Sequence, residues 1–406
     1  MTSNPSKNFI ICLLGALSVI SPFAIDMYLP AFPQVAADLG VSSAMISLTL
    51  SGYFIGMALG QLFYGPLLDR FGRKKPLCIG LLAFIATSIT CVFAPTIESI
   101  VVLRFIQAIG GCAAGVASLA MVRDFFAVEE SAKILSRLFL FIAISPLLAP
   151  TIGGMVALTF GWKAVFIVLA MIVGVILALI YFLLPESHLP DPTISLRPSP
   201  IIREYITILL HPRFKTYALS GAFSFAGLFT YVAGSPIIFM DNFHLSAKTF
   251  SAIFAVLATG FIGGSQINVW LLRRFSSEAL FLRLLIVQVV TGLVFVAGSW
   301  HGLYGLYSTL VLFYIFLSCA GLTYPNAAAL ALAPFSRNAG SAAALLGFVQ
   351  LGVGALISTG ISLSTSRDSF PIIFILGATS LIGFIILLAG RKRAHDCPVS
   401  EDVAAA

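Results

Sequence analysis

The sequence predicts an all-α membrane protein whose twelve transmembrane helices form two pseudo-symmetric bundles of six. Three observations predict this fold class: the composition, the length of the apolar runs, and a partial repeat between the two halves. The chain has 406 residues, of which 59% are hydrophobic and only 10% are charged, and its mean hydropathy is +1.04. Soluble domains carry about 25% charged residues. The composition therefore excludes an ordinary soluble fold.

The apolar runs are long and unalternated, whereas a membrane β-barrel would alternate apolar and polar residues in short segments. A hydrocarbon core of about 30 Å needs about 20 apolar residues per helix. Only helices and closed barrels satisfy their backbone groups in lipid. We therefore expect transmembrane helices at approximately 9–33, 44–67, 77–94, 98–121, 136–158, 163–184, 215–239, 249–271, 280–299, 303–325, 339–361 and 370–390.

The densest cluster of charge, from Gly65 to Lys75, lies between the second and third apolar runs. It holds four cations, one acid and two glycines, which predicts a tight loop at one membrane face. Lys and Arg mark the cytoplasmic face. If this loop and both termini are cytoplasmic, 19 of the 23 Lys and Arg residues lie on that side; the other four are Lys163, Lys248 and Arg367 outside, and Arg104 within a span. This asymmetry predicts that both termini are cytoplasmic.

One long gap between apolar runs, from Pro185 to Arg213, is rich in proline. It predicts a cytoplasmic linker between two halves. The expected domains are an N-terminal six-helix bundle over 1–184, the linker over 185–213, and a C-terminal six-helix bundle with a short tail over 214–406. Within the linker, the segment 201–210 could lie on the membrane surface.

The two halves also repeat in part. Leu67–Phe71 aligns with Leu271–Phe275 at an offset of 204 residues, which places Gly60 on Gly264. The second copy lacks the acid and the later glycine. Internal symmetry of this kind is typical of secondary transporters, whose site lies near mid-membrane between the halves.

Two firmly ionised groups, Asp26 and Arg104, lie well inside the predicted helices. A charge in hydrocarbon costs at least ~2.5–3.5 kcal/mol, so each group must face a wet cavity or a partner. At a rise of ~1.5 Å per residue, Asp26 lies ~5 Å below the outer edge of a ~30 Å core and Arg104 ~9 Å deep. The similar depths permit the two side chains to be close.

Two interpretations of Asp26 are open. It either binds and releases a proton during transport, or it only caps or orients a helix that is broken by the prolines around it (Pro22, Pro30 and Pro33). Arg104 likewise either takes part in that coupling or fixes buried backbone carbonyl groups.

Other classes of function fit the sequence poorly. The formal charge of +7 does not indicate nucleic-acid binding, because the cations lie in short loops between apolar runs. The six cysteines form no metal-spaced or CxxC set, so we predict no metal and no cofactor. An enzyme inside the membrane would need clusters of His, Asp, Glu or Ser within the helices. The scarcity of buried acids and the absence of buried His argue against one.

Aromatic and weakly polar side chains inside the helices are candidates for the wall of a substrate cavity, because aromatic rings offer adaptable apolar area. The alternative is that they face lipid or neighbouring helices. The candidates are Tyr28, Tyr53, Gln107, Phe225, Phe229, Tyr231, Asn268 and Gln350.

Four segments of the first half carry a family resemblance. They are Gly65-x-Leu67-x-Asp69-Arg70-x-Gly72-Arg73-Lys74, Leu103-Arg104-x-x-Gln107-x-x-Gly110-Gly111, Ser145-Pro146-x-x-Ala149-Pro150-x-x-Gly153-Gly154 and Ile25-Asp26-Met27-Tyr28-Leu29-Pro30-x-x-Pro33. In this order and in these helices, they resemble the motifs of drug/proton antiporters of the major facilitator superfamily. The combination is most similar to the bicyclomycin and chloramphenicol resistance branch.

The resemblance implies roles for particular residues. Asp26 matches the protonatable acid of the first helix, and Arg104 matches an arginine linked to proton coupling. Asp69 and Arg73 match loop residues that hold the inward ends of the two halves together as a latch, with Gly65, Arg70 and Gly72 in the same motif. Arg73 would pair with Asp124. Alternatively, the loop only sets the topology.

The fifth helix carries the motif associated with antiporters. Pro146 and Pro150 each remove a helix hydrogen bond, and Gly153 and Gly154 allow close helix approach. Such a helix could seal the outer pathway; the alternative is ordinary packing of small residues.

One feature departs from the pattern. Ser18 stands eight residues before Asp26, where some antiporters of this class carry a second acid, and Thr230 stands at the repeat position of Asp26. We therefore expect one titrating site, which favours neutral, zwitterionic or monovalent substrates.

The resemblance and the residues together predict a proton-coupled antiporter that exports small amphipathic drugs or drug-like metabolites from the cytoplasm by alternating access. We expect a monomer in the bacterial inner membrane, driven by the proton gradient, with a small-molecule substrate, protons and lipid as its partners. Two alternatives are a dedicated exporter of an amino acid, sugar or siderophore, and a proton symporter for uptake.

Overall fold

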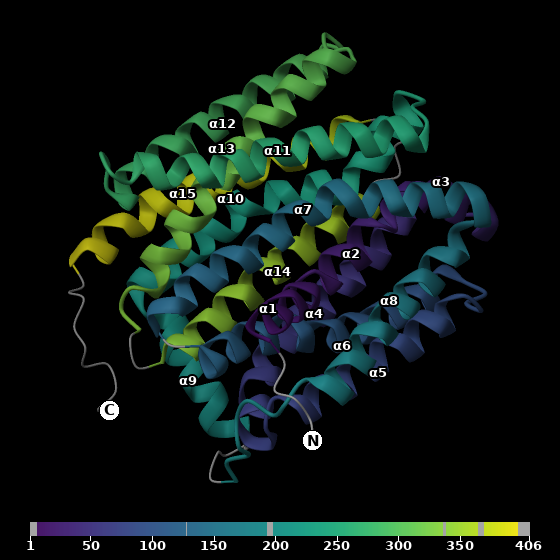
Figure 1. The fold of residues 1–406 in the computed structure, drawn as a ribbon. Coiled ribbons are helices and arrows are strands. Elements are labelled where there is room, and N and C mark those ends of the chain that lie inside the picture. Colours follow the sequence, from purple (N-terminus) through teal and green to yellow (C-terminus); the bar gives the residue numbers. More distant parts are fainter. Residues whose placement is uncertain (1–5, 127, 193–197, 336–337, 364–368, 397–406) are drawn as a thin grey trace. The chain divides into compact units, whose positions relative to one another are not determined.

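The computed structural model describes residues 6–126, 128–192, 198–335, 338–363 and 369–396. Over these residues every regular element is a helix (Figure 1). Twelve helical segments are long and apolar enough to cross a membrane. The predicted fold class and the predicted number of spans are therefore confirmed.

The chain divides into two compact units. Unit 1 comprises Met1–Arg197 and Ser246–Ala255, and unit 2 comprises Pro198–Leu245 and Val256–Ala406. The boundary after Arg197 falls within the proline-rich gap, whereas the segment Ser246–Ala255 of the second half groups with unit 1. The domain boundaries given above stay a prediction.

The first span of unit 1 is not one continuous helix. It is divided into α1 (Lys7–Ser18), α2 (Ile20–Asp26), the 3-10 turn η1 (Leu29–Ala31) and α3 (Phe32–Leu39). Proline explains both breaks, because it has no N–H for the carbonyl four residues earlier. Pro22 thus leaves the carbonyl of Ser18 without a helical donor where α1 ends, and Pro30 does the same to Asp26 where α2 ends. The predicted broken helix is confirmed.

The other five spans of unit 1 are α4 (Ser43–Phe71), α5 (Lys74–Cys91), α6 (Ile97–Phe125), α7 (Val128–Phe160) and α8 (Trp162–Leu183). Their ends follow local rules. Ser42 accepts a hydrogen bond from the amide of Met45 at the start of α4, and Thr96 and Ser99 form a capping box at the start of α6. Gly72 ends α4 with a φ of 81°, which favours glycine.

Unit 2 begins with α9 (Pro198–Leu210), a short helix in the segment expected at the membrane surface. Its spans are α10 (Pro212–Pro236) with the π-helical turn η2 (Ile237–Asn242), α11 (Ala247–Leu271, whose first turns belong to unit 1), α12 (Ser277–Trp300), α13 (Leu306–Leu332), α14 (Ala339–Leu363) and α15 (Phe370–Asp396).

Two predicted boundaries differ most from the structure. The fifth span was expected to begin at residue 136, but α7 begins at Val128. The tenth span was expected to end at Pro325, but α13 continues to Leu332. Membrane helices tolerate such a proline because neighbouring groups satisfy the freed carbonyl.

The repeat of 204 residues reappears as close helix packing. In unit 1, a Cβ on Gly60, the repeat partner of Gly264, would lie 2.7 Å from Cβ of Cys112. One turn earlier, a Cβ on Gly56 would lie 2.3 Å from the Phe105 carbonyl oxygen, so α4 touches α6 backbone to backbone. In unit 2, a Cβ on Gly264 would lie 2.4 Å from the Ser318 carbonyl oxygen, so α11 approaches α13 in the same way. Small residues permit this approach between membrane helices.

Candidate functional site

The break after α2 places Asp26 at a helix end inside the first span. In a continued α-helix the amide of Tyr28 would bond the carbonyl of Ala24; here it bonds the carbonyl of Ile25, at 3.3 Å. The carbonyl of Ala24 instead accepts a hydrogen bond from Nη2 of Arg104, at 2.9 Å. Arg104 thus supplies the donor that the broken helix has lost.

Arg104 is fully buried. Its Nη1 donates to Oε1 of Gln107 at 2.7 Å, and Nε2 of Gln107 donates to Oγ of Ser88 at 2.6 Å. The guanidinium lies 4.3 Å from the ring centroid of Tyr53 and 5.1 Å from that of Tyr28. Ring faces attract a cation most strongly where water is absent, so this cage compensates a charge that pairs with no carboxylate among the described residues.

Asp26 itself is buried, with 7% of its surface exposed. Among the described residues, none forms a hydrogen bond or ion pair with its side chain. Arg104 contacts the same helix two residues earlier, at Ala24, and stacks near Tyr28 two residues later. The two ionisable groups therefore share one neighbourhood without forming an ion pair. The roles proposed for them stay predictions.

The antiporter motif of α7 packs against this break. A Cβ on Gly153 would lie 2.0 Å from the carbonyl oxygen of Met27, so only glycine fits there. The carbonyl of Pro150 accepts a hydrogen bond from Oγ of Ser251 at 3.0 Å, and Ser251 also lies beside Gly154. This side of α7 thus connects the Asp26 break to the first turns of α11, within unit 1. Pro146 lies inside α7 without ending it.

The charged loop between α4 and α5 forms a network within unit 1. Nε of Arg73 donates to Oδ2 of Asp124 at 2.9 Å, and Nη1 of Arg73 donates to Oδ1 of Asp69. The Arg73–Asp124 pair implied by the resemblance is present. Burial acts to lower the pKa of Arg73, but its bonds to Asp124 and Asp69 outweigh burial and raise it.

Two further residues of the predicted latch motif, Gly65 and Arg70, lie in α4, and their role in a latch stays a prediction. A Cβ on Gly65 would meet no atom within 4 Å, so packing does not require glycine there. The guanidinium of Arg70 lies over the ring of its neighbour Phe71, at 5.8 Å.

The cavity candidates fall into two groups. Tyr28, Tyr53 and Gln107 surround Arg104 in unit 1. The others lie in unit 2 and are buried or nearly so: Phe225, Phe229, Tyr231, Asn268 and Gln350.

In unit 2, sequence reasoning missed two partners of these candidates. The ring of Tyr324 lies 4.6 Å from that of Phe225 at 32°, and Nδ2 of Asn326 donates to Oδ1 of Asn268 at 2.6 Å. Tyr324 is 37% exposed. The sequence offered one signal for these two residues: Tyr324 and Asn326 are polar side chains within an apolar run.

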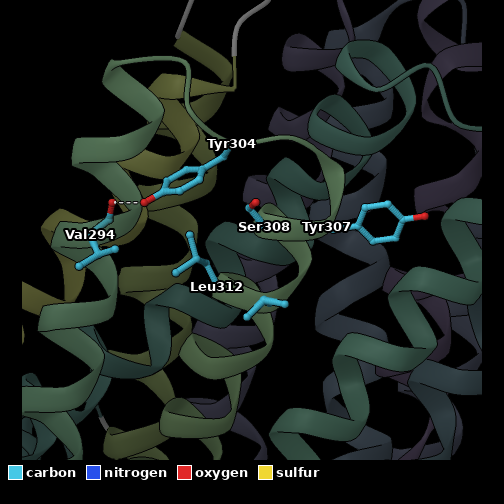
Figure 2. Close-up of a pocket in the computed structure, with 6 residues that line it drawn as sticks. Val294, Tyr304, Tyr307, Ser308 and Leu312 are labelled. Atoms are coloured by element: carbon cyan, nitrogen blue, oxygen red, sulfur yellow. Dashed lines mark hydrogen bonds between the residues drawn. The ribbon is translucent and has the colours of Figure 1, made fainter.

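A hollow of about 470 Å³ lies between α12 and α13, away from all these residues (Figure 2). The hydroxyl of Tyr304 donates to the carbonyl of Val294 at 2.9 Å across it. Its lining is Val294, Tyr304, Tyr307, Ser308, Val311 and Leu312. It holds no ionisable group suited to coupling. In the described part of the chain, no three His, Cys, Asp or Glu side chains are placed to hold a metal ion.

Known proteins match the chain over nearly its full length. A bicyclomycin resistance protein homolog of Haemophilus influenzae is 30% identical over 385 residues, which cover 95% of this chain and 96% of the relative. The multidrug resistance protein MdtL of Escherichia coli is 32% identical over 396 residues, covering 96% and 98%. An uncharacterized MFS-type transporter, YdgK, of Bacillus subtilis is 33% identical over 387 residues, covering 93% and 95%.

Solved structures share the fold. A bacterial homolog of the human lysosomal transporter Spinster, in an inward-facing and occupied conformation, superposes with a TM-score of 0.76 at 14% identity and covers 100% of both chains. A D-xylose–proton symporter superposes with a TM-score of 0.73 at 14% identity, covering 95% of this chain and 98% of the other. The model of the Major Facilitator Superfamily matches residues 14–359. The chain therefore belongs to the Major Facilitator Superfamily, as a multi-pass membrane transporter of small molecules and not an enzyme.

Proposed function

We propose that this protein exports small amphipathic molecules, drugs among them, from the cytoplasm in exchange for protons. The relatives named for bicyclomycin and multidrug resistance support the class of substrate. The observation that carries the coupling is the Asp26 carboxyl group, which is buried at a helix break and has no hydrogen-bond or ion-pair partner within the described part of the chain.

Asp26 is suited to exchange a proton because its neighbourhood can change. In general, burial raises the pKa of a carboxyl group and a nearby cation lowers it. Arg104 is held by Ala24, two residues away, and not by Asp26. A rearrangement at the break that brought the guanidinium to the carboxylate would favour proton release, and its return to Ala24 would favour proton uptake.

The proton and the substrate must then shift the equilibrium between the two conformational states of the transporter in opposite directions. A ligand shifts a conformational equilibrium only through its differential affinity for the two states. We propose that Asp26 loads a proton from outside when substrate leaves, and releases it inward when substrate binds. The proton gradient is the only energy source in this scheme, and the transporter acts as a monomer.

The orientation follows from charge. The excess of Lys and Arg on the side of the Gly65–Lys75 loop supports a cytoplasmic position for that loop and for both termini. The bacterial relatives support placement in the inner membrane.

Proteoliposomes that contain a pH-sensitive dye test the proposal. With a preset proton gradient, addition of bicyclomycin and a panel of amphipathic compounds should discharge the gradient for the compounds that are exported. Counterflow in the same vesicles gives the direction. Transport of a compound with no movement of protons would reject the coupling, and co-directional movement of both would identify a symporter.

A further inference from the structure

The start of α5 is capped by a residue far along the chain. Arg73, which precedes α5, makes no side-chain cap of its own. Oε1 of Glu186 accepts hydrogen bonds from the backbone amides of Arg73, at 2.8 Å, and Lys74, at 3.2 Å. A carboxylate at a helix N-terminus satisfies free N–H groups and complements the helix dipole.

The end of α8 is capped in return. Nζ of Lys74 donates to the carbonyl oxygens of Tyr181 and Leu184, both at 2.8 Å. Tyr181 belongs to the last turn of α8 and Leu184 is the residue that ends it. The carbonyls at a helix C-terminus lack helical donors, and an ammonium group is favourable there. Since α5 and α8 pack side by side, each helix supplies the cap that the other lacks (Figure 1).

The residues after α8 also contact both acids that hold Arg73. Oγ of Ser187 donates to Oδ2 of Asp124 at 2.9 Å, the oxygen that accepts from Nε of Arg73. The backbone amide of Asp191 donates to the carbonyl of Asp69 at 3.3 Å. The segment 185–191 therefore lies against the whole Arg73 network.

The close contact between Gly72 and the segment after α8 is independent evidence for the same packing. A Cβ there would lie 3.0 Å from Oε2 of Glu186 and 3.1 Å from the carbonyl oxygen of His188, in addition to its φ of 81°. Glycine at this position thus admits the segment that follows α8, besides turning the chain after α4.

We propose that Glu186 is a positioning residue for Arg73, and that Lys74 and Glu186 form a clasp between α5 and α8 that holds Arg73 between Asp69 and Asp124. The clasp holds the first residues after α8 against the other helices of unit 1. Since this stretch leads on to unit 2, it connects the Arg73 network to the rest of the chain by a covalent route. The clasp does not depend on proton coupling, and only its effect on export rests on the proposed transport of a substrate.

Hydrogen exchange of the full-length protein tests the clasp directly. In Glu186→Ala the amides of Arg73 and Lys74 should exchange at least about tenfold faster, because each loses a hydrogen bond to a charged acceptor. Glu186→Gln keeps an acceptor oxygen and should restore part of the protection. Glu130→Ala, which removes an exposed acid paired with Lys7, is the matched control and should leave these amides unchanged.

Double mutants test whether Glu186 acts through Arg73. The loss of export caused by Glu186→Ala, and its shift in thermal unfolding, should largely disappear in an Arg73→Ala background. Lys74→Arg should restore export that Lys74→Ala loses, since either cation can bond the carbonyls of α8. Unchanged exchange at Arg73 and Lys74 in Glu186→Ala, or effects of Glu186 and Arg73 that simply add, would overturn the proposal. Export can fail for want of a transported compound; hydrogen exchange and unfolding decide the clasp without one.

Discussion

Arg104 donates a hydrogen bond to the carbonyl oxygen of Ala24, two residues before Asp26, and not to the Asp26 carboxylate. This bond joins α6 to the second of the two breaks in the first span, where α2 ends. It is consistent with the simpler of the two interpretations of Arg104, in which it fixes a backbone carbonyl. It also leaves the Asp26 carboxyl group, two residues away, without an ion pair to this guanidinium.

Replacing Asp26 tests the coupling. Asp26→Asn keeps the shape but cannot exchange a proton, so proton-driven export should be abolished while the protein still reaches the membrane. The measurement is export into vesicles with and without an imposed gradient. Asp38→Asn is the control, because Asp38 is an exposed acid of α3 in the same span. Export that still responds fully to the gradient in Asp26→Asn would remove Asp26 from the mechanism.

Replacing Arg104 by lysine tests whether the positive charge alone is sufficient or the planar guanidinium is also required. Arg104→Lys keeps a cation but cannot bridge the Gln107 side chain and the Ala24 carbonyl as a planar guanidinium does. We expect export to fall at least about tenfold, and the free energy of unfolding to fall by about 1–3 kcal/mol because a buried acceptor loses its donor. Thermal unfolding and export of the purified protein measure both. If lysine supports normal export, the charge alone suffices and the bond to Ala24 is dispensable.

Gly153 should tolerate no side chain. In Gly153→Ala the new methyl group would lie 2.0 Å from the carbonyl oxygen of Met27, so α7 or the break must move. Overpacking of this kind costs about 1–3 kcal/mol, which thermal unfolding detects. Gly174→Ala in α8 is the matched control, since its Cβ meets no atom within 4 Å. Equal stability of the two variants would contradict the packing described here.

His211, in the turn between α9 and α10, should make the stability of the folded protein depend on pH. His211 is buried against Phe335, with ring centroids 5.2 Å apart. Burial, and then the neighbouring Arg213, lower the pKa of His211 from its ordinary value of 6.5. The unfolded chain therefore binds this proton more readily, so His211 contributes stability above about pH 6.5 that is lost as the pH falls below it.

His211→Phe should remove that dependence. The aromatic contact is retained while the titrating group is lost, so the melting temperature should fall less between pH 7.5 and pH 5.5 (chosen to bracket the ordinary histidine value) than in the wild type. His301→Phe, at an exposed position, should behave as the wild type. Identical slopes for all three proteins would exclude His211 as the source.

Local features of the chain were predictable. The twelve spans follow from the length of the apolar runs, and the break at Asp26 follows from Pro22 and Pro30, because the missing N–H groups act within four residues. The Arg73–Asp124 ion pair was predicted from the family resemblance. The end of α13 was placed seven residues too early, because Pro325 stays inside the helix and the helix continues to Leu332.

The sequence by itself determined that this is a twelve-span transporter of two related halves with one deeply placed acid, Asp26, in a broken first helix, since length, hydropathy and proline act locally. Only the tertiary structure decided that Arg104 bonds Ala24, that Gly153 meets Met27, and that Glu186 caps the helix after Arg73. Glu186 is 113 residues from Arg73, and Arg104 is 80 residues from Ala24. Such partners are chosen by how buried polar groups find donors once the helices pack, and no pattern along the chain records that choice.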